Sequence, residues 1–502
     1  MATRKLWLVF GGLFLFGLGA ACGSSDNGDA PGADAGASSE PDAGSDAAAS
    51  PPPPNDASFP SDGTLPTPPA DAAAGVDAGA PTDASAAPDA NDAGDASDAG
   101  LDLSGQDITF FAFGDPQFGG GPADKNSFHI QALNAAAALT WPADGGFESS
   151  GPIGDPRGVI IAGDLTQNGQ SGRDPFNEWY LLPQYQFDLN AEYGIDASVP
   201  VVAAELGLFL RDYGLRGNDG KDPFVLKYRV FEGYGNHDFD TLTPDPSADP
   251  VYYGNEAPAR DVVSLRNRVR ASWPEMRRFA PGNAGHYSWD WDQTHFVHLN
   301  LVGSDKVGGD DDGGSQAPRD PQGALTFLIA DLAAEVGTSC RPVILIMHYG
   351  FDDFSEEGRW WDEEQRQAFL QAIRPYDIAA ILHGHVHETR AYSMADTQGK
   401  AYDVFSLGSP YYEGQATNGG RGHFQVFHIK GKHIDAADIS WLPSNPAPAM
   451  GDNVDLWTGK TLADVGFQIT TTFADGWGGW AYSKDIDVSS CAKGYMASTD
   501  GP

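Results

Sequence analysis

Cysteine is scarce in this chain, which has three in 502 residues, at positions 22, 340 and 491. Closed structural zinc sites are commonly built from several cysteine thiolates, so this scarcity argues against such a site. Cys340 and Cys491 can pair in a disulfide or remain thiols, and the sequence leaves both alternatives open.

Basic residues are also few, since 30 Lys and Arg stand against 70 Asp and Glu and give a formal net charge of -40. Binding a nucleic-acid backbone requires a basic face, so we expect no nucleic-acid partner. A phosphorylated substrate would need another source of positive charge. Bound metal cations are the obvious alternative, because they can be the largest local charges in a site.

Long hydrophobic runs are missing except at the start, where Arg4 and Lys5 precede an apolar run at 6–20. This run of about 15 residues is short for a membrane span, which needs about 20. A charged, then apolar, then small-residue order is typical of an export signal. We therefore expect the protein to be exported to the cell envelope, in the periplasm or at the cell surface.

The segment "GLGAAC" at 17–22 resembles a bacterial lipobox, which implies that Cys22 is lipidated and anchors the mature protein to a membrane. Gly19 departs from the Leu usual at that position, and an ordinary secretory signal is the alternative. The sequence does not determine the membrane leaflet or the oligomeric state.

Residues 23–105 contain no Lys or Arg and few large apolar residues. Such a segment cannot bury enough surface to offset its conformational entropy, so we predict a disordered acidic tether. The predicted organisation is a signal peptide at 1–22, a linker at 23–105, a folded domain at 106–435 with a rim insertion at 170–226, and a C-terminal extension at 436–502 that packs on the domain.

After the tether, short apolar runs alternate with segments of helical periodicity. Near-continuous apolar runs are typical of strands covered on both faces, and the alternation predicts an α/β layered domain. The predicted strands are 107–115, 157–164, 229–238, 295–301, 341–350, 377–387, 402–410 and 423–429. The aromatic residues of "GHYSWDWDQTHF" can line a pocket or pack across strands.

Acids, amides and imidazoles follow five of these strands at the point where each apolar run stops. In open α/β sheets ligands bind outside the carboxyl ends of the strands. Carboxylate and amide oxygens with imidazoles suit Mn, Fe or Zn, and one shared carboxylate, for which Asp164 is the candidate, can bridge two cations. The residues at these positions are Asp115, Asp164, Asn236, His237, His348, His385 and His387.

Five short motifs occur in a fixed order: "GD" at 114–115, "GDLTQNG" at 163–169, "GNHD" at 235–238, "MHYG" at 347–350 and "GHVH" at 384–387. Together they resemble the motifs of the calcineurin-like metallophosphoesterases. The resemblance implies an α/β/β/α sandwich that holds two divalent metal ions, with Mn or Fe favoured and Zn or Mg as alternatives. It implies that Asp115 and His387 bind the first metal, that Asp164 bridges, and that Asn236, His348 and His385 bind the second.

The same resemblance implies the chemistry. His237 resembles the catalytic histidine that contacts the phosphate and protonates the leaving oxygen, with Asp238 orienting it, while a hydroxide held by the metals attacks phosphorus in line. The expected activity is hydrolysis of phosphate esters, first as a phosphomonoesterase. The first alternative is a phosphodiesterase or phosphoinositide phosphatase. The second alternative is a catalytically weak metal-binding surface lipoprotein.

The first motif departs from the common pattern, because Asp-Pro-Gln stands where the family commonly has Asp-x-His. This resembles a branch of the superfamily that also reads "DPQFG". Gln117 offers a neutral amide oxygen, a weaker donor than imidazole. It can bind the first metal or hydrogen-bond a metal-bound water, and Asn168 and His383 are further candidates for positions behind the ligands.

Overall fold

Strands and helices are assigned in a computed structural model. It describes residues 101–118, 126–143, 145–167, 169, 186–197, 201–218, 220–222, 224–238, 240–241, 254–255, 257–306, 320–351, 361–410, 422–443, 467–468 and 477–488. The predicted signal peptide and nearly all of the predicted tether, together with Cys22, Asn168 and Cys491, lie outside these ranges. None of the helices in the described ranges has the length and hydrophobicity that a membrane span requires.

The first sheet is mixed, with a parallel part formed by β1, β2 and β5. Its order is β17-β16-β15-β1-β2-β5, and β18 pairs along β16. All contacts of β15 and β16 within it are antiparallel. The strands are β1 Asp107–Phe113, β2 Val159–Ile161, β5 Val230–Glu232, β15 Gly422–Lys430, β16 His433–Pro443, β17 Phe467–Gln468 and β18 Trp477–Asp485.

The second sheet has the order β13-β14-β12-β11-β10-β9-β8. Its centre, β10, β11, β12 and β14, is parallel, and antiparallel strands flank this centre on both sides. The strands are β8 Met276–Phe279, β9 Tyr287–Trp291, β10 Thr294–His298, β11 Val343–Met347, β12 Ile378–His383, β13 Arg390–Ala395 and β14 Ala401–Ser406.

The two sheets pack face to face through aromatic side chains, as the alternation along β1 shows. Phe110 points to the second sheet, where its ring lies 5.8 Å from that of Trp291 and 5.5 Å from that of Phe296. Phe111, the next residue, contacts Phe424 on the opposite face, as expected for side chains that alternate along a strand. Trp291 therefore belongs to the core, which decides between the two alternatives for the "YSWDW" segment.

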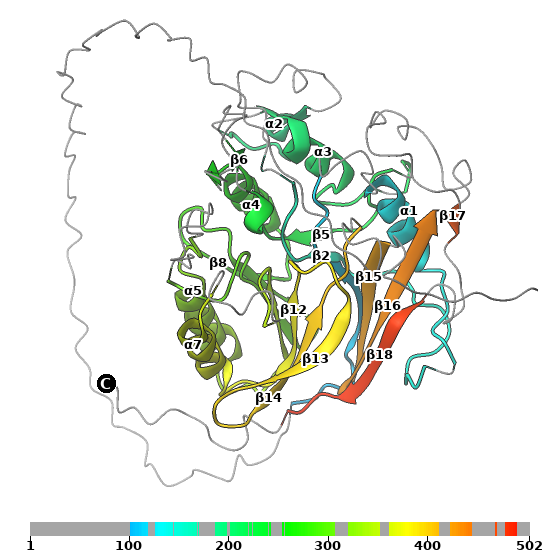
Figure 1. The fold of residues 1–502 in the computed structure, drawn as a ribbon, viewed down its shortest axis with the longest axis vertical. Helices are drawn as coiled ribbons and strands as arrows, with labels where there is room; N and C mark the ends of the chain where they lie inside the picture. Colours follow the sequence, from blue (N-terminus) through cyan, green and yellow to red (C-terminus); the bar gives the residue numbers. More distant parts are fainter. Residues whose placement is uncertain are drawn as a thin grey trace, which may run out of the picture. The chain divides into compact units, whose positions relative to one another are not determined.

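Helices cover the outer faces (Figure 1). On the first sheet, α1 (Asn126–Ala136) packs against β16, where the Trp441 indole donates to the His129 ring at 2.9 Å. On the second, α7 (Glu363–Ile373) begins at a capping box formed by Asp362 and Gln365. The layer order α/β/β/α confirms the predicted fold class. The remaining helices are α2 Leu189–Tyr193, α3 Ala204–Asp212, α4 Ala257–Arg270 and α5 Ala324–Asp331, which continues as a π-helical turn at Leu332–Val336.

Smaller elements and the C-terminal strands complete the described part of the chain. Two short hairpins occur, β3 (Phe187–Asp188) with β4 (Val201–Val202) and β6 (Asp240–Thr241) with β7 (Gly254–Asn255). Each of the eight predicted apolar runs overlaps an observed strand, whereas β8, β9, β13, β16, β18 and the two-residue strands were not predicted. β16 extends across position 435, where the sequence placed the end of the folded domain, and the domain boundaries stay a prediction.

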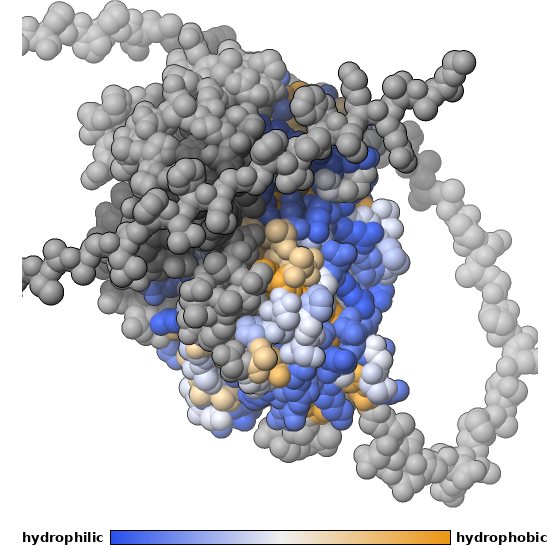
Figure 2. Space-filling view, turned by 90° about the vertical axis from the view of Figure 1, so that its right-hand side faces the viewer, coloured by the Kyte–Doolittle hydropathy of each residue, from blue (hydrophilic) through white to orange (hydrophobic). Residues whose placement is uncertain are grey.

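Two further features concern the surface and the cysteines. The described residues visible in Figure 2 are mainly hydrophilic, with small hydrophobic patches between the polar residues. Cys340 is disulfide-bonded, and its partner lies outside the described residues.

Candidate metal centre

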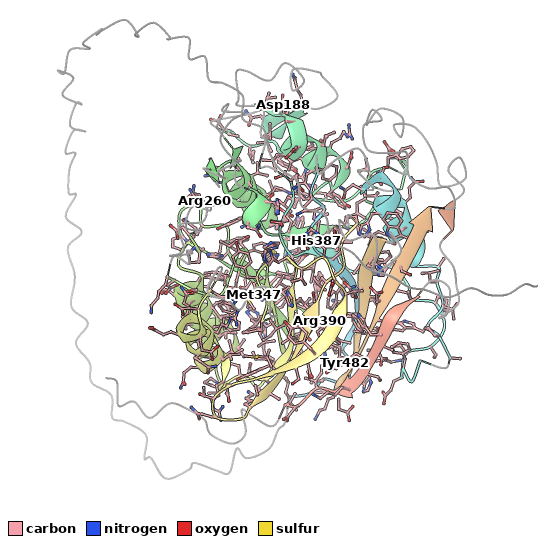
Figure 3. All side chains as sticks on the ribbon, viewed as in Figure 1. Asp188, Arg260, Met347, His387, Arg390 and Tyr482 are labelled. Carbon is pink, nitrogen blue, oxygen red and sulfur yellow. The ribbon has the colours of Figure 1, made fainter. Side chains whose placement is uncertain are left out.

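The candidate ligands lie where the parallel strands of both sheets end. The first sheet supplies oxygen donors and the second supplies imidazoles, and Figure 3 places His387 at the end of the sandwich away from Tyr482 of β18. In chain order, Asp115 follows β1, Asp164 follows β2, Asn236 follows β5, His348 follows β11, and His385 and His387 follow β12.

These six residues converge in space. Asp164, His348 and His385 form one group whose ligand atoms all lie within 4.8 Å of one another, and Asp115, Asp164 and His387 form a second such group. Asn236 joins the first group, because its Oδ1 lies 2.8 Å from His348 Nε2. Asp164 is therefore common to both groups, and the structure brings together all six residues that the sequence predicted to hold metal.

The local backbone at the centre is unusual. Asp115, Gln117, Asp164, His385 and His387 all have positive φ, between 39° and 78°. Non-glycine residues rarely adopt this left-handed region. Each such conformation costs about 1–3 kcal/mol and persists only where the surrounding structure enforces it. The conformation turns each side chain sharply away from its strand, so that donors from separate strands meet.

Two glycines of the motifs are required by close approach. A Cβ on Gly235 would lie 2.3 Å from Asp164 Oδ1 and 2.8 Å from His348 Cδ2. Gly163 has φ +92°, and a Cβ there would lie 2.6 Å from His348 Nδ1. A side chain at either position would displace the ligands, which explains why glycine precedes the polar residue in these motifs.

His348 is held so that one ring nitrogen faces the other donors. Its Nδ1 donates to the backbone oxygen of Ala162 at 2.8 Å, and its Nε2 lies 3.2 Å from Asp164 Oδ1. Burial lowers the pKa of His348, but the negative charges of Asp164 and Asp115 outweigh burial and raise it to about 9. A positive charge is thus strongly favoured among these converging oxygens, which is the environment that a divalent cation requires.

Asp164 and Asp115 carry the negative charge of the centre, and both are fully buried. Burial raises the pKa of Asp164, but His348 and His237 outweigh it and hold the pKa far below its usual range. Asp115 accepts the His385 backbone N–H at 3.0 Å, and its Oδ1 lies 3.4 Å from His387 Nε2. The pKa of His387 is raised, because the charge of Asp115 outweighs burial.

His237 lies at the edge of the centre and is half-buried. Its backbone N–H donates to Asp164 Oδ1 at 2.8 Å, which ties its position to the shared carboxylate. Its Nδ1 lies 2.9 Å from the backbone oxygen of Gln167. Because a carbonyl can only accept, Nδ1 is the donor in this contact.

Asp238 does not have the role that the sequence predicted, which was to orient His237. One of its oxygens accepts the backbone N–H groups of Gly235 at 2.8 Å and Leu165 at 3.0 Å. The other accepts the N–H of Thr166 at 2.8 Å and its hydroxyl at 2.9 Å. The carboxylate therefore fastens the loop after β2 to the loop after β5, and the Gln167 oxygen orients the His237 ring instead.

The pKa of Asp238 reflects this position. Burial, followed by the negative charge of Asp164, raises it to about 7.

Comparisons with known proteins add little to this geometry. No family model matches the chain, and no curated protein matches it. Among solved structures, the chain is similar to the crystal structure of a dimetal phosphatase from Danio rerio, at 12% identity and a TM-score of 0.37, covering 66% of this chain and 98% of that one. At this TM-score the similarity carries no argument, so the site rests on its own residues.

Gln117 contacts the shared carboxylate directly. Its Nε2 donates to Asp164 Oδ2 at 3.3 Å, and its buried Oε1 has no hydrogen-bond partner among the described residues. Leaving a buried acceptor unpaired costs about 1–3 kcal/mol, so an acceptor kept here indicates a partner outside the described residues. A cation or a water molecule fits the amide oxygen.

Other residues hold the ligands from behind, and the sequence identified few of them. The Asn300 backbone oxygen accepts the His348 N–H at 2.7 Å, and the Ser409 hydroxyl donates to the Asp115 backbone oxygen at 2.8 Å. Asn300 and Ser409 both follow apolar strands, and this is the same sequence position that identified the ligands. His383 contacts the Gly384 oxygen and the Tyr392 hydroxyl, each at 2.9 Å, while Asn168 lies outside the described residues.

Proposed function

We propose that this protein is a two-metal phosphoesterase that hydrolyses phosphate monoesters. The observation that carries the proposal is the sharing of Asp164 by two groups of ligand atoms. Two-metal hydrolases place their cations a few Å apart, and a carboxylate with two oxygens can serve both. A single-metal site needs no second group.

The donors fit divalent cations. Asp115 and His387 would hold one ion, Asn236, His348 and His385 the other, and Asp164 both. All are oxygen or imidazole donors, a set that suits Mn or Fe, with Zn or Mg as alternatives. Bound cations of this kind lower the pKa of water and neutralise charge on a phosphoryl group.

The chain's own groups support the proton transfer that ester hydrolysis needs. His237 is fixed at two points, by its backbone N–H on Asp164 and by its ring on Gln167. A ring so held can protonate the leaving oxygen of a phosphate ester through Nε2, and a positioned acid contributes about 10²–10⁴-fold to rate.

The charge balance of the protein supports the same assignment. A net charge of -40 repels a phosphate group, so an anionic substrate needs a strong local positive charge. Cations at the centre would supply that charge. The same balance is unsuited to nucleic acid.

We further propose that the protein acts outside the cytoplasm and that a lipid attached to Cys22 anchors it to a membrane. The support is the order of charged, apolar and small residues in the first 22 positions, followed by an acidic segment without Lys or Arg. Labelling with a radioactive fatty acid in the native host tests this, and unchanged labelling of a Cys22→Ala variant would contradict it.

The function is tested on the purified full chain by metal analysis and by hydrolysis of aryl phosphates. We expect two divalent ions per chain and faster turnover of a monoaryl than of a diaryl phosphate. Faster turnover of the diester would move the assignment to a phosphodiesterase. Two bound metals without turnover of any ester would favour the catalytically weak binding protein, and no bound metal would overturn the proposal.

A further inference from the structure

A buried carboxylate of β16, outside the ligand motifs, lies behind one half of the metal centre. Asp438 is fully buried. Its Oδ2 lies 2.8 Å from His423 Nδ1, and its Oδ1 accepts from Gln425 Nε2 at 2.7 Å and from the Thr389 hydroxyl at 3.0 Å. Three donors on one buried carboxylate form a rigid junction, because charge-assisted hydrogen bonds are short and strong.

The first connection runs from this junction to His387. Thr389 follows His387 by two residues, and its hydroxyl also accepts from Gln425 Nε2 at 2.8 Å and from Trp480 Nε1 at 2.7 Å. His385 and His387 both have positive φ, a strained conformation that persists only where neighbours enforce it. The Thr389 hydroxyl fixes the end of this strained segment.

The second connection runs from the same junction to Asp115. The Gln425 amide oxygen accepts the Gly408 N–H at 3.0 Å, and the Gly408 oxygen accepts the Gly114 N–H at 2.9 Å. The adjacent Ser409 donates its hydroxyl to the Asp115 backbone oxygen at 2.8 Å. A continuous chain of hydrogen bonds therefore links the junction to the residue before this ligand.

The other half of the centre is held differently. His348 is fixed by the backbone oxygens of Ala162 and Asn300, and Asp164 by the His237 N–H. None of these contacts involves β16 or Thr389. A disturbance at the junction should therefore reach the two halves unequally.

We propose that Asp438 is a positioning residue that sets the Asp115 and His387 half of the centre through Thr389 and Gln425. The inference rests on the proposed function, because it concerns metal affinity at that site. Residues behind metal ligands typically change affinity 10–100-fold when altered. We expect this change in metal affinity at the Asp115 and His387 half of the centre and not at the other half.

The test is Mn²⁺ titration by calorimetry of the full-length protein after chelator treatment. Thr389→Val removes the hydroxyl and keeps the shape, and we expect roughly tenfold weaker binding at one of two sites, with the other within about threefold. Thr389→Ser should restore the affinity. Thr294→Val, which removes the buried hydroxyl that donates to Gln106 at 2.9 Å, is the matched control and should change neither affinity.

Asp438→Asn gives an independent arm, with Asp331→Asn as a control for the loss of a buried carboxylate. Asp331 accepts from a serine hydroxyl and a histidine, yet neither of its partners is a ligand of the centre. We expect Asp438→Asn to change the ratio of the two affinities and Asp331→Asn to leave it unchanged. Equal weakening at both sites, or no weakening in Asp438→Asn and Thr389→Val, would overturn the inference.

These outcomes are separable from the proposed function. A wild-type protein that binds two ions and hydrolyses phosphate esters supports the function whatever the variants do. A wild-type protein that binds no metal overturns both.

Discussion

Two of the buried clusters of histidine and carboxylate within the described residues differ in how their charges are balanced. In the first, the metal centre, Asp115, Asp164 and three histidines converge. In the second, the His295 ring lies between two acids, with Nδ1 2.7 Å from Asp290 and Nε2 2.7 Å from Asp331.

The second cluster is closed by the protein itself. Arg277 and Arg341 both pair with Asp290, and the Ser288 hydroxyl donates to Asp331 at 2.6 Å. Two guanidinium groups balance the charges of the two acids, so no cation is needed. Within the described residues, the ion pairs of the candidate metal centre involve only histidine and aspartate, and Gln117 adds another acceptor. Buried carboxylate and histidine alone therefore do not indicate a metal site; an excess of acceptors does.

The largest effect that separates the clusters is expected from Asp164→Asn. The change removes the carboxylate common to both ligand groups, and with it several kcal/mol of charge stabilisation, so phosphoesterase turnover should fall about 10³-fold or more. Metal analysis should show loss of at least one ion per chain. Turnover and metal content like those of the wild type would contradict the role of the centre.

The second effect concerns His237→Ala, which removes the ring and keeps the ligands. We expect kcat to fall about 10²-fold or more, because a positioned proton donor is lost. Metal content should stay at the wild-type value, which distinguishes this change from a ligand change. An ester with a leaving group of low pKa should be less affected, and equal loss on all esters would argue against proton donation.

The third effect is on stability and concerns the closed cluster. Asp331→Asn leaves His295 beside one acid instead of two and weakens the two buried hydrogen bonds to this carboxylate, and a hydrogen bond to a charged group contributes about 1.5–3 kcal/mol. We expect a lower midpoint in urea, with turnover per folded molecule unchanged. Added Mn²⁺ should still raise the free energy of unfolding, by about 2.7 kcal/mol at a free concentration a hundredfold above Kd. Lost activity in the folded variant would mean that the clusters are coupled.

The smallest effect is expected from a third cluster of histidine and carboxylates, in which exposure to solvent weakens the electrostatic interactions. His433 Nδ1 lies 2.9 Å from Asp485, its Nε2 lies 3.3 Å from Asp435, and Glu148 is 3.7 Å away. Burial lowers the pKa of His433, but the hydrogen bond to Asp485 and the charges of Asp435 and Glu148 outweigh it and raise the pKa above its usual 6.5.

A raised folded-state pKa gives stability that is fully present below pH 6.5 and is lost as pH rises through the folded value. Because Asp485 and Glu148 are exposed, we expect under about 1 kcal/mol. His433→Gln should lower the thermal midpoint at pH 6 more than at pH 9. An equal decrease at both values would show that the ring contributes by packing alone.

Much of the site could be predicted from the sequence, because the informative residues are local to each strand end. An apolar run that stops at Gly-Asp or Gly-Asn predicts both the strand and the polar residue that follows it. The glycine is required because the ligands pack closely against its backbone. The helices α1, α4, α5 and α7 also lie in segments whose apolar residues recur at helical spacing, a signal local to each segment. Contacts between segments gave no such signal, so the role assigned to Asp238 was wrong and Thr166, Gln167 and Asn300 were missed.

The sequence by itself determined the class of layered fold, the alternation of strands and helices, and the kinds of donor at the strand ends. Only the tertiary structure decided that oxygens from one sheet meet imidazoles from the other, that Asp164 is common to two ligand groups, and that Asp438 contacts both Thr389 and Gln425. The physical reason is that the hydrophobic pattern of a segment depends only on the burial and periodicity of its own residues. Whether ligands from separate strands meet depends on sheet order, register and the packing of the two sheets across the core.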